Sequence, residues 1–364
     1  MRITIVGGGN GAFAAAGDLT LRGFECTLLE LPEFASNIEP VQQAGGLNVT
    51  LLEGLQDIRP GFARVAATTD PETALAGSEL VLAIVPSFAH RRVAEFCAPY
   101  LRRNQCVVLM PGNLGGSASF GQYLNKYGAP PVRLAETSCM IYACRKAGAA
   151  QVLIRGYKKG LCLAALPSSQ TDDVMDVITR AYPDMVRADN VLETGLGNVN
   201  PYFHPPIALC NAARIESGEK FRFYYEGSTR GVCRIADSLD AERIALGATL
   251  GLRLEPMWKV ALGWYEHEGA HGKDLYDVHH TVPAYKVSTA PAVLESRYFT
   301  EDLPFGLVPI RELGGSLGLT MPLTDAMIHL SNALVGRDLS KEARSLREIG
   351  WIPATPEQLI RMVS

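Results

Sequence analysis

The 364-residue sequence has no long apolar run and no strong excess of either charge. No segment approaches the ~18 consecutive apolar residues of a membrane-spanning helix. Residues 1 to 6 run directly into glycines, which leaves no room for the apolar region of a signal peptide. The formal net charge of -4 gives no attraction to nucleic acid or to an anionic membrane. We therefore expect small molecules as partners, and neither nucleic acid nor membrane.

The sequence also lacks paired cysteine motifs, internal repeats and low-complexity tracts. Its eight cysteines are scattered and form no Cys-x-x-Cys pair, and most of them lie in apolar runs. This usage is typical of reduced thiols and predicts a cytoplasmic location. A chain of 364 residues is too long for one ordinary core, so its length favours two domains.

Short β-branched runs alternate with helical patterns through the first half of the chain. The strands are expected at 2–6, 25–30, 79–85, 105–110 and 132–137, with 151–156 and 160–167 at the far edge of the same sheet. Helical patterns dominate from about residue 190, at 206–216, 240–252, 257–268 and 322–336. We expect an α/β protein, with an N-terminal Rossmann-type doubly wound parallel sheet at 1–190 and a mostly helical domain at 191–364. A homodimer through apolar helices of the second domain is possible.

The first expected strand ends in the sequence GGGNGA, which fits the G-x-G-x-x-A pattern of dinucleotide-binding turns. Gly7 permits the tight turn, Gly9 lets backbone N–H groups approach a pyrophosphate, and Ala12 allows close helix packing. The helix that follows would place its N-terminus towards the anion, with Asn10 and Gly11 in its first turn. A purely structural glycine turn is the alternative, since a motif this short is weak evidence.

Glu30 strengthens the dinucleotide interpretation. It closes the second expected strand 18 residues after Ala12, near the ~20 at which an acid binds the adenosine ribose. A carboxylate at this place repels a 2'-phosphate, and no arginine follows before Arg59. The sequence therefore favours NAD over NADP.

Further cofactor contacts are expected at the carboxyl ends of later strands, where ligands of parallel sheets lie. Pro86 and Asn113 follow the third and fourth strands, and Thr137 and Ser138 end the fifth, where they would face the nicotinamide. Ordinary βα turns, and small residues that satisfy backbone groups, are the alternatives.

The stretch NPYFHPP places His204 among aromatic and proline residues in apolar surroundings. A lone histidine in such company is more often a satisfied core residue than a proton carrier. Pro205 and Pro206 suit the opening of a helix, so we expect His204 at the mouth of that helix. Asn200 precedes His204 by one turn, and Asn211 would lie on the same face further on.

Four stretches carry a family resemblance: PGNLGG (111–116), AETSCMIYACR (135–145), NVNPYFHPPIALCNAARIESG (198–218) and RYFTEDLPFGLVPI (297–310). In these motifs the chain resembles the opine dehydrogenase family. The resemblance implies reductive condensation of an amino acid with a 2-oxo acid such as pyruvate, with NADH as hydride donor, and the reverse oxidation. It also implies a catalytic histidine supported by an aspartate, which correspond to His204 and Asp302.

The residues agree with this chemistry. Imine formation and its reversal need proton transfer near neutral pH, where a histidine side chain works in both directions. Carboxylate substrates call for arginine, and the candidates are Arg297, Arg214 and Arg145, each of which could equally be a structural ion pair. Asn200, Asn211 and Arg297 are the expected substrate-binding residues.

One motif points elsewhere. HEGAH, from His267 to His271 with Glu268, matches the H-E-x-x-H pattern of zinc proteases. The pattern needs a continuous helix, and Gly269 predicts that the helix ends there, so we expect no metal site. A second alternative is a non-catalytic NAD-binding sensor, because a fold alone does not define activity.

Overall fold

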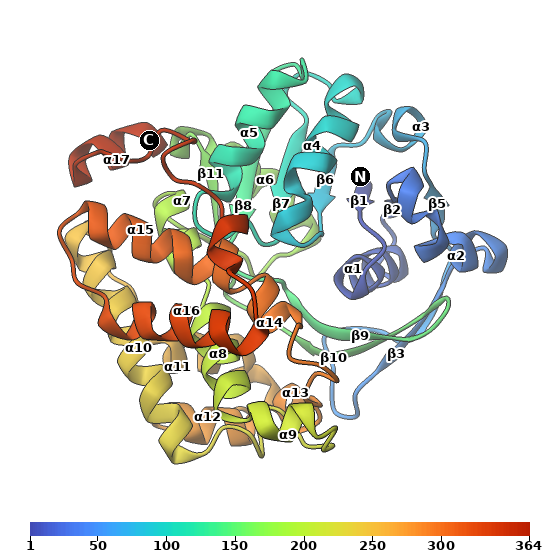
Figure 1. Ribbon diagram of the computed structural model, residues 1–364. Coiled ribbons are helices and arrows are strands. Elements are labelled where there is room, and N and C mark those ends of the chain that lie inside the picture. Colours follow the sequence, from blue (N-terminus) through green and yellow to red (C-terminus); the bar gives the residue numbers. More distant parts are fainter. The chain divides into compact units, whose positions relative to one another are not determined.

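The computed structural model describes all 364 residues. The chain forms two compact units, one of residues 1–112 and 116–191, the other of residues 113–115 and 192–364 (Figure 1). No helix in either unit is long and apolar enough to cross a bilayer.

The first unit contains an eight-stranded sheet in the order β12-β11-β8-β7-β6-β1-β2-β5. Its strands are β1 (Arg2–Val6), β2 (Glu25–Leu29), β5 (Ala66–Thr68), β6 (Leu80–Ala83), β7 (Cys106–Leu109), β8 (Arg133–Thr137), β11 (Cys162–Leu166) and β12 (Val186–Arg187). Neighbours are parallel except β8 and β11, which run antiparallel. The strands β1, β6 and β7 are almost fully buried, as expected of a sheet covered on both faces. The predicted α/β class with a doubly wound sheet is confirmed.

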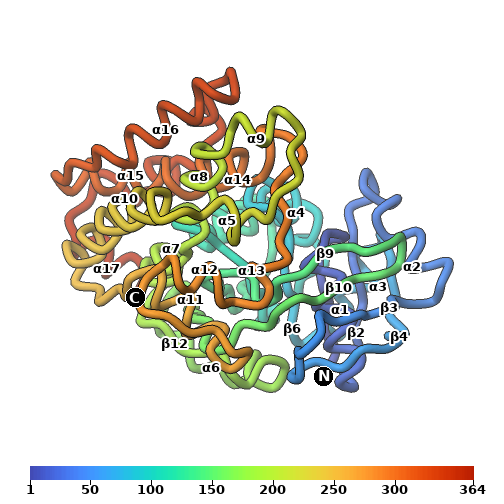
Figure 2. The backbone as a smooth tube through the Cα atoms, turned by 90° about the horizontal axis from the view of Figure 1, so that it is seen from below, coloured from blue at the N-terminus to red at the C-terminus, as the bar shows by residue number.

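A second sheet in the same unit departs from the sequence prediction. Its order is β4-β3-β10-β9, from the strands β3 (Leu47–Leu51), β4 (Gly61–Ala63), β9 (Tyr142–Gly148) and β10 (Gln151–Tyr157) (Figure 2). Residues 151–156 were expected at the far edge of the main sheet, and that placement is wrong. They form a hairpin with β9 and pair in parallel with β3, so that one face, with Val152 and Ile154, is buried. Helix α1 (Asn10–Leu21) packs against strands of both sheets.

The remaining helices of the first unit are short and lie between its strands. They are α2 (Glu39–Ala44), α3 (Pro71–Leu75), α4 (His90–Cys97), α5 (Gly116–Lys126) and α6 (Thr171–Ala181), with α7 (Val191–Leu196) leading into the second unit. The second unit contains α8 (Asn200–Cys210), α9 (Ala212–Glu216), α10 (Arg230–Thr249), α11 (Met257–Tyr265), α12 (Leu275–Thr281), α13 (Pro283–Lys286), α14 (Arg297–Thr300), α15 (Val308–Ser316), α16 (Pro322–Val335) and α17 (Pro356–Val363).

Helix α8 lies at the centre of the second unit, packed against α10, α14 and α16 (Figure 1). It begins at Asn200 with Pro201 in its first turn, so Pro205 and Pro206 lie inside the helix. The expectation that these two prolines open a helix is therefore wrong, and His204 lies within the helix and not at its mouth. Interior prolines remove backbone donors. The complete burial of neighbours such as Tyr202 and Ile207 offsets that cost.

Candidate active site

His204 and Asp302 come from distant parts of the chain and form a direct hydrogen bond. His204 projects from α8, and its Nδ1 lies 2.7 Å from Oδ2 of Asp302. The two side chains are 12% and 11% exposed, so the pair is largely shielded but reachable. An ionised carboxylate only accepts hydrogen bonds, so Nδ1 carries the proton of the neutral ring and Nε2 presents its lone pair. The pair has the geometry of an oriented acid–base histidine.

Two tyrosines complete the surroundings of the ring. The hydroxyl of Tyr224 lies 2.8 Å from Nε2 of His204, where it donates its proton to the neutral imidazole. The ring of Tyr298 lies over the imidazole with a centroid distance of 4.3 Å, and Phe223 stacks on Tyr298 at 4.4 Å. Burial raises the pKa of Tyr224 well above its ordinary value, so this phenol stays protonated.

The backbone near Asp302 explains why this carboxylate faces α8. Asp302 follows α14 and precedes a π-helical turn, Leu303–Leu307, and turns of this kind are frequent at functional sites. The N–H of Asp302 donates to the carbonyl of Arg297, and its own carbonyl accepts from Leu307. Gly306 lies so close to Pro201 of α8 that an added Cβ would be 2.5 Å from the proline Cγ. The glycine thus permits the close approach of the turn to α8.

Arg297 stands at the first position of α14. Its Nε donates to Glu301 at 2.9 Å, while the side chain remains 68% exposed. Neither terminal nitrogen of the guanidinium makes a hydrogen bond, so two donors in a fixed plane are available to a carboxylate. Arg297 precedes Asp302 by five residues, which puts this fork on the same segment as the acidic partner of His204.

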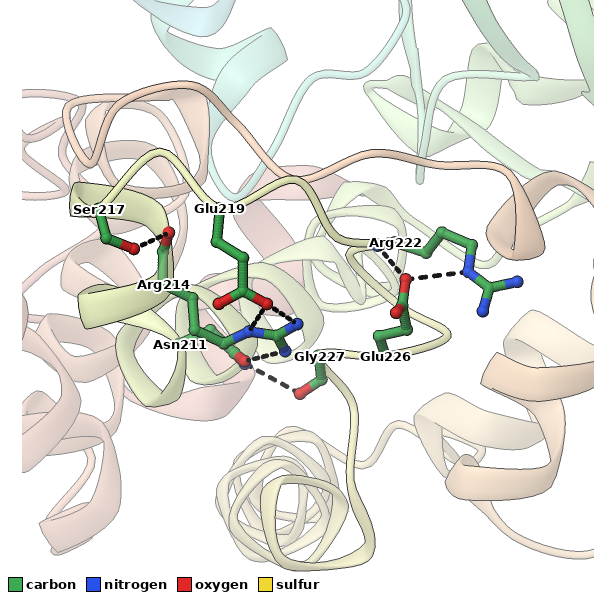
Figure 3. Close-up of polar contacts among 7 residues, drawn as sticks. All are labelled: Asn211, Arg214, Ser217, Glu219, Arg222, Glu226 and Gly227. Atoms are coloured by element: carbon green, nitrogen blue, oxygen red, sulfur yellow. Dashed lines mark hydrogen bonds and ion pairs between the residues drawn. The ribbon is translucent and has the colours of Figure 1, made fainter.

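Asn211 was expected to bind substrate, and in the structure its side chain is hydrogen-bonded to other residues of the protein (Figure 3). Its Nδ2 donates to the carbonyls of Ile207 and Gly227, and its Oδ1 accepts from Arg214. Arg214 also pairs with Glu219 at 2.7 Å. Asn211 therefore ties the end of α8 to the segment around Gly227. A role in substrate binding stays a prediction.

Asn200 and Asn113 belong to one polar cluster of the second unit. The N–H of Asn200 donates to Oδ1 of Asn198, and the Asn198 amide donates to Asn113. Asn113 has a left-handed backbone with φ of 60° and is buried. It was expected among the cofactor contacts of the first unit, yet residues 113–115 pack with the second. Arg344 holds this segment through the carbonyl of Leu114 at 2.8 Å.

The glycine turn of the first unit has the shape of a dinucleotide cradle. Gly7 has φ of 124°, and an added Cβ would lie 2.6 Å from the carbonyl oxygen of Ile84. Gly11 is equally confined, by the side chains of Ile84 and Met140. Gly9, in contrast, is exposed at the N-terminus of α1, and an added Cβ there would meet no protein atom within 4 Å. Space reserved at the N-terminus of a helix fits a bound pyrophosphate.

The other residues of this turn fit the same group. Ala12 is fully buried, as close packing of α1 requires, and Asn10 accepts a hydrogen bond from the N–H of Lys146. Glu30 directly follows β2 and lies beside the turn: an added Cβ at Gly8 would lie 2.5 Å from Oε2 of Glu30. That carboxylate accepts from Leu31 N and from Asn37. An acid in this position suits a free ribose hydroxyl, as in NAD.

The remaining expected cofactor residues lie at strand ends of the main sheet. Pro86 follows β6, and Thr137 and Ser138 end or follow β8. The hydroxyl of Thr137 donates to the carbonyl of Cys139 at 2.8 Å, and both Thr137 and Ser138 are buried. Thr137 therefore satisfies a backbone carbonyl, which was the alternative to a cofactor contact in the sequence analysis. Nicotinamide contacts of these residues stay predictions.

The HEGAH segment lacks the helix that its zinc motif needs. Helix α11 ends at Tyr265, a single 3-10 turn spans Glu266–Glu268, and Gly269 adopts φ of 90°. This confirms the predicted helix end. Nδ1 of His271 donates to the carbonyl of Gly269, and the ring of His267 lies 3.7 Å from the Glu268 carboxylate. No three His, Cys, Asp or Glu side chains of the chain are grouped to hold a metal.

Comparisons with known proteins show the family of the chain. Residues 187–335 match the family model described as NAD/NADP octopine/nopaline dehydrogenase, alpha-helical domain. The chain is 35% identical to an opine dehydrogenase of Arthrobacter sp. (strain 1C), over 95% of this chain and 94% of that protein. Octopine dehydrogenase solved with NADH and L-arginine is 22% identical, with a TM-score of 0.78 over 99% and 98% of the two chains. Its structure with NADH and pyruvate gives a TM-score of 0.74 at 22% identity, over 96% of each.

The fold and the family match define a nicotinamide-dependent oxidoreductase. The chain belongs to the opine dehydrogenase family. The predicted family, enzyme class and nicotinamide cofactor are thereby confirmed.

Two residues at the imidazole, Tyr224 and Tyr298, were not predicted from the sequence. Tyr224 stands in FRFYYEG, an aromatic-rich run that follows the HPP motif, and Tyr298 stands inside RYFTED itself. The density of aromatic residues was the available signal. Lys146 was also missed, although it follows Arg145, and its ammonium lies 3.8 Å from the centre of the Phe13 ring in α1.

Proposed function

We propose that His204, oriented by Asp302, moves protons in the NAD(H)-dependent reductive condensation of an amino acid with a 2-oxo acid such as pyruvate, and in the reverse oxidation. The observation that carries the proposal is the 2.7 Å bond between Nδ1 of His204 and the Asp302 carboxylate. This bond fixes which ring nitrogen is basic, the requirement for a directed proton transfer.

The condensation needs a base first and an acid afterwards. An amino acid arrives as an ammonium group, and His204 accepts one proton to leave a nucleophilic amine. The amine adds to the carbonyl carbon of the 2-oxo acid and forms a carbinolamine. The imidazolium returns its proton to the departing hydroxyl, which leaves as water, and an iminium remains. His204 thus ends in its starting form, and Asp302 stabilises the intermediate imidazolium.

The nicotinamide, when bound, supplies the hydride that reduces the iminium carbon to a secondary amine. Gly7, Gly9, Asn10, Gly11 and Ala12 would hold its pyrophosphate against the N-terminus of α1. Glu30 would accept the ribose hydroxyls, which favours NAD(H) over NADP(H). Pro86, Thr137, Ser138 and Asn113 are the further cofactor residues that we propose.

Arg297 would bind the 2-oxo acid. Its unpaired terminal nitrogens form a planar fork that matches a carboxylate in two parallel hydrogen bonds. Glu301 binds Nε of Arg297 and leaves the two terminal nitrogens available to the substrate. Asn200 is proposed as a second substrate contact from the first turn of α8.

The protein is proposed to work in the cytoplasm on small molecules, without nucleic acid or membrane, and a homodimer is possible. None of the eight cysteines forms a disulfide bond, which supports a reducing compartment.

A grid of 2-oxo acids against amino acids, followed by NADH oxidation, tests the function. His204→Gln should retain NADH binding by fluorescence titration and lose turnover by ~100-fold or more, the scale of acid–base help. His329→Gln changes an exposed histidine of α16 and should behave as the unmodified protein. NADH binding without turnover on any pair would favour a sensor, and full activity of His204→Gln would refute the role of this residue.

A further inference from the structure

The structure points to a function for Tyr224 that no motif of the sequence assigns. We propose that the hydroxyl of Tyr224 relays the proton between the substrate amine and Nε2 of His204. The proposal rests on the proposed function, because it specifies how His204 receives and returns its proton.

Both ring nitrogens of His204 are already hydrogen-bonded. Nδ1 faces Asp302 at 2.7 Å and Nε2 faces the Tyr224 hydroxyl at 2.8 Å. Tyr298 lies over the ring at 4.3 Å. A substrate amine therefore finds no open nitrogen on the imidazole. Either Tyr224 turns away during each turnover, or the proton passes through its hydroxyl.

The packing of Tyr224 disfavours a turn. Its ring stacks on Tyr285 with a centroid distance of 4.1 Å and an interplanar angle of 19°. The edges of His279 and Phe223 enclose it at 5.2 Å each. Only 7% of the residue is exposed. Rotation of the side chain would break these contacts in a densely packed interior.

The loop that carries Tyr224 is held on both sides of this residue, by contacts of Arg222 and Gly227 that Figure 3 shows. Arg222 binds Glu226 through both its backbone N–H and its Nε, at 2.7 Å and 2.9 Å. The carbonyl of Gly227 accepts from Asn211 at 2.9 Å. Gly227 itself has no room for a side chain, because an added Cβ would lie 2.4 Å from the Phe223 carbonyl oxygen. These contacts fix the loop on both sides of the tyrosine.

A hydroxyl suits the relay because it donates and accepts at once. It donates to the neutral imidazole and accepts from the imidazolium, so each charge state of His204 keeps its partner. Besides His204, the groups that face the phenol are Asp302, Tyr298, Tyr285, Tyr265 and His279. None of them is a cation that would stabilise a phenolate, so the phenol passes a proton on and does not hold a charge.

The step is balanced. The substrate ammonium gives one proton to the oxygen of Tyr224 while the phenolic proton moves to Nε2 of His204. The products are a neutral amine, an intact phenol and an imidazolium whose Nδ1–H remains on Asp302. After addition to the 2-oxo acid, the same two protons move back and the carbinolamine hydroxyl leaves as water.

Tyr224→Phe keeps the stacked ring and removes only the hydroxyl. We expect kcat to fall by about 100-fold, within the range of general acid–base catalysis, with KM for NADH and for the 2-oxo acid within about threefold. Tyr225→Phe is the matched control, since this neighbour also lies on the loop but contacts His280 and Arg222, and not His204. A kcat of Tyr224→Phe close to that of Tyr225→Phe would overturn the relay.

Replacement of Tyr224 by 3-fluorotyrosine separates the relay from a purely steric role, even where the phenylalanine variant folds poorly. The fluorinated phenol is more acidic and nearly the same size. A relay predicts a change in kcat and in its pH profile, whereas a structural hydroxyl predicts the profile of the unmodified protein. Loss of activity in His204→Gln together with normal activity in both Tyr224 variants would reject the relay and leave the proposed function intact. An unmodified protein without turnover on any substrate pair would reject the proposed function.

Discussion

The bond between Asp302 and His204 allows a sharp prediction for the substitution Asp302→Asn. The asparagine has the size of the aspartate and can keep a hydrogen bond over the 2.7 Å to Nδ1. Its amide can donate, however, and an Nδ1 that accepts forces the ring proton onto Nε2. The ring then offers a proton where the reaction needs a lone pair, and it meets the donor hydroxyl of Tyr224.

The magnitude follows from two effects. General acid–base help is worth ~10²- to 10⁴-fold in rate, and the same change in a serine protease triad costs ~10⁴-fold in kcat. For a pair that is 12% and 11% exposed, where water reaches the ring only partly, we expect a loss of ~10³-fold. At ~1.36 kcal/mol per tenfold this corresponds to about 4 kcal/mol of transition-state stabilisation.

Steady-state NADH oxidation on the best substrate pair measures kcat, and fluorescence titration measures NADH binding, which should be unchanged. Asp325→Asn is the control, an acid of α16 that is 45% exposed and pairs with Arg311. A kcat of Asp302→Asn within tenfold of the unmodified protein would show that the carboxylate does not set the tautomer, and the acid–base reasoning would fail.

Three further substitutions test other parts of the structure. Glu30→Gln removes the charge that repels a 2'-phosphate, so the ratio of kcat/KM for NADPH to kcat/KM for NADH should rise about tenfold. An unchanged ratio would show that Glu30 does not bind the ribose. Arg297→Lys loses the planar fork and should raise KM for the 2-oxo acid about tenfold without affecting KM for NADH; equal effects on both would point to a structural role. Burial, with smaller effects of His280 and His204, lowers the pKa of His279 to about 3, so the folded chain excludes a proton that the unfolded chain binds below ~6.5. As the pH drops below ~6.5, the free energy of unfolding of the unmodified protein should therefore fall more steeply than that of His279→Gln, by up to ~1.4 kcal/mol per pH unit. Urea denaturation at a series of pH values measures both, and parallel pH profiles of the two proteins would contradict this.

Much of the main sheet could be predicted because its strands are short buried runs between helical patterns. The second sheet could not, since β4 has only three residues, and Tyr142–Gly148 of β9 combines polar and exposed positions. For β10 the pattern predicts a strand but contains no information about its partners. The start of α8 was misplaced because the local preference of Pro205 and Pro206 competes with the burial of the whole helix.

The site shows the same limit. Residues 204 and 302 are separated by 98 positions, and only the family resemblance suggested the pair, which the structure places in contact. Nothing in FRFYYEG distinguishes Tyr224, buried beside the imidazole, from Tyr225, which stacks on Arg222. The amide of Asn211 has the right chemistry to bind a substrate, but it is hydrogen-bonded to its neighbours in space, Gly227 and Arg214. The sequence gives the chemistry of a side chain, whereas tertiary packing determines which groups it contacts.

The short segment Asn113–Gly115 decides how the protein can be divided. It belongs with the helical unit, while the chain on either side of it belongs with the sheet, so the polypeptide changes units after residues 112, 115 and 191. A fragment that starts at Leu192 would leave Asn198, Arg344 and the close contact at Gly195 without their partners. The helical part is thus not a detachable module, and a working fragment would have to bring this tripeptide with it.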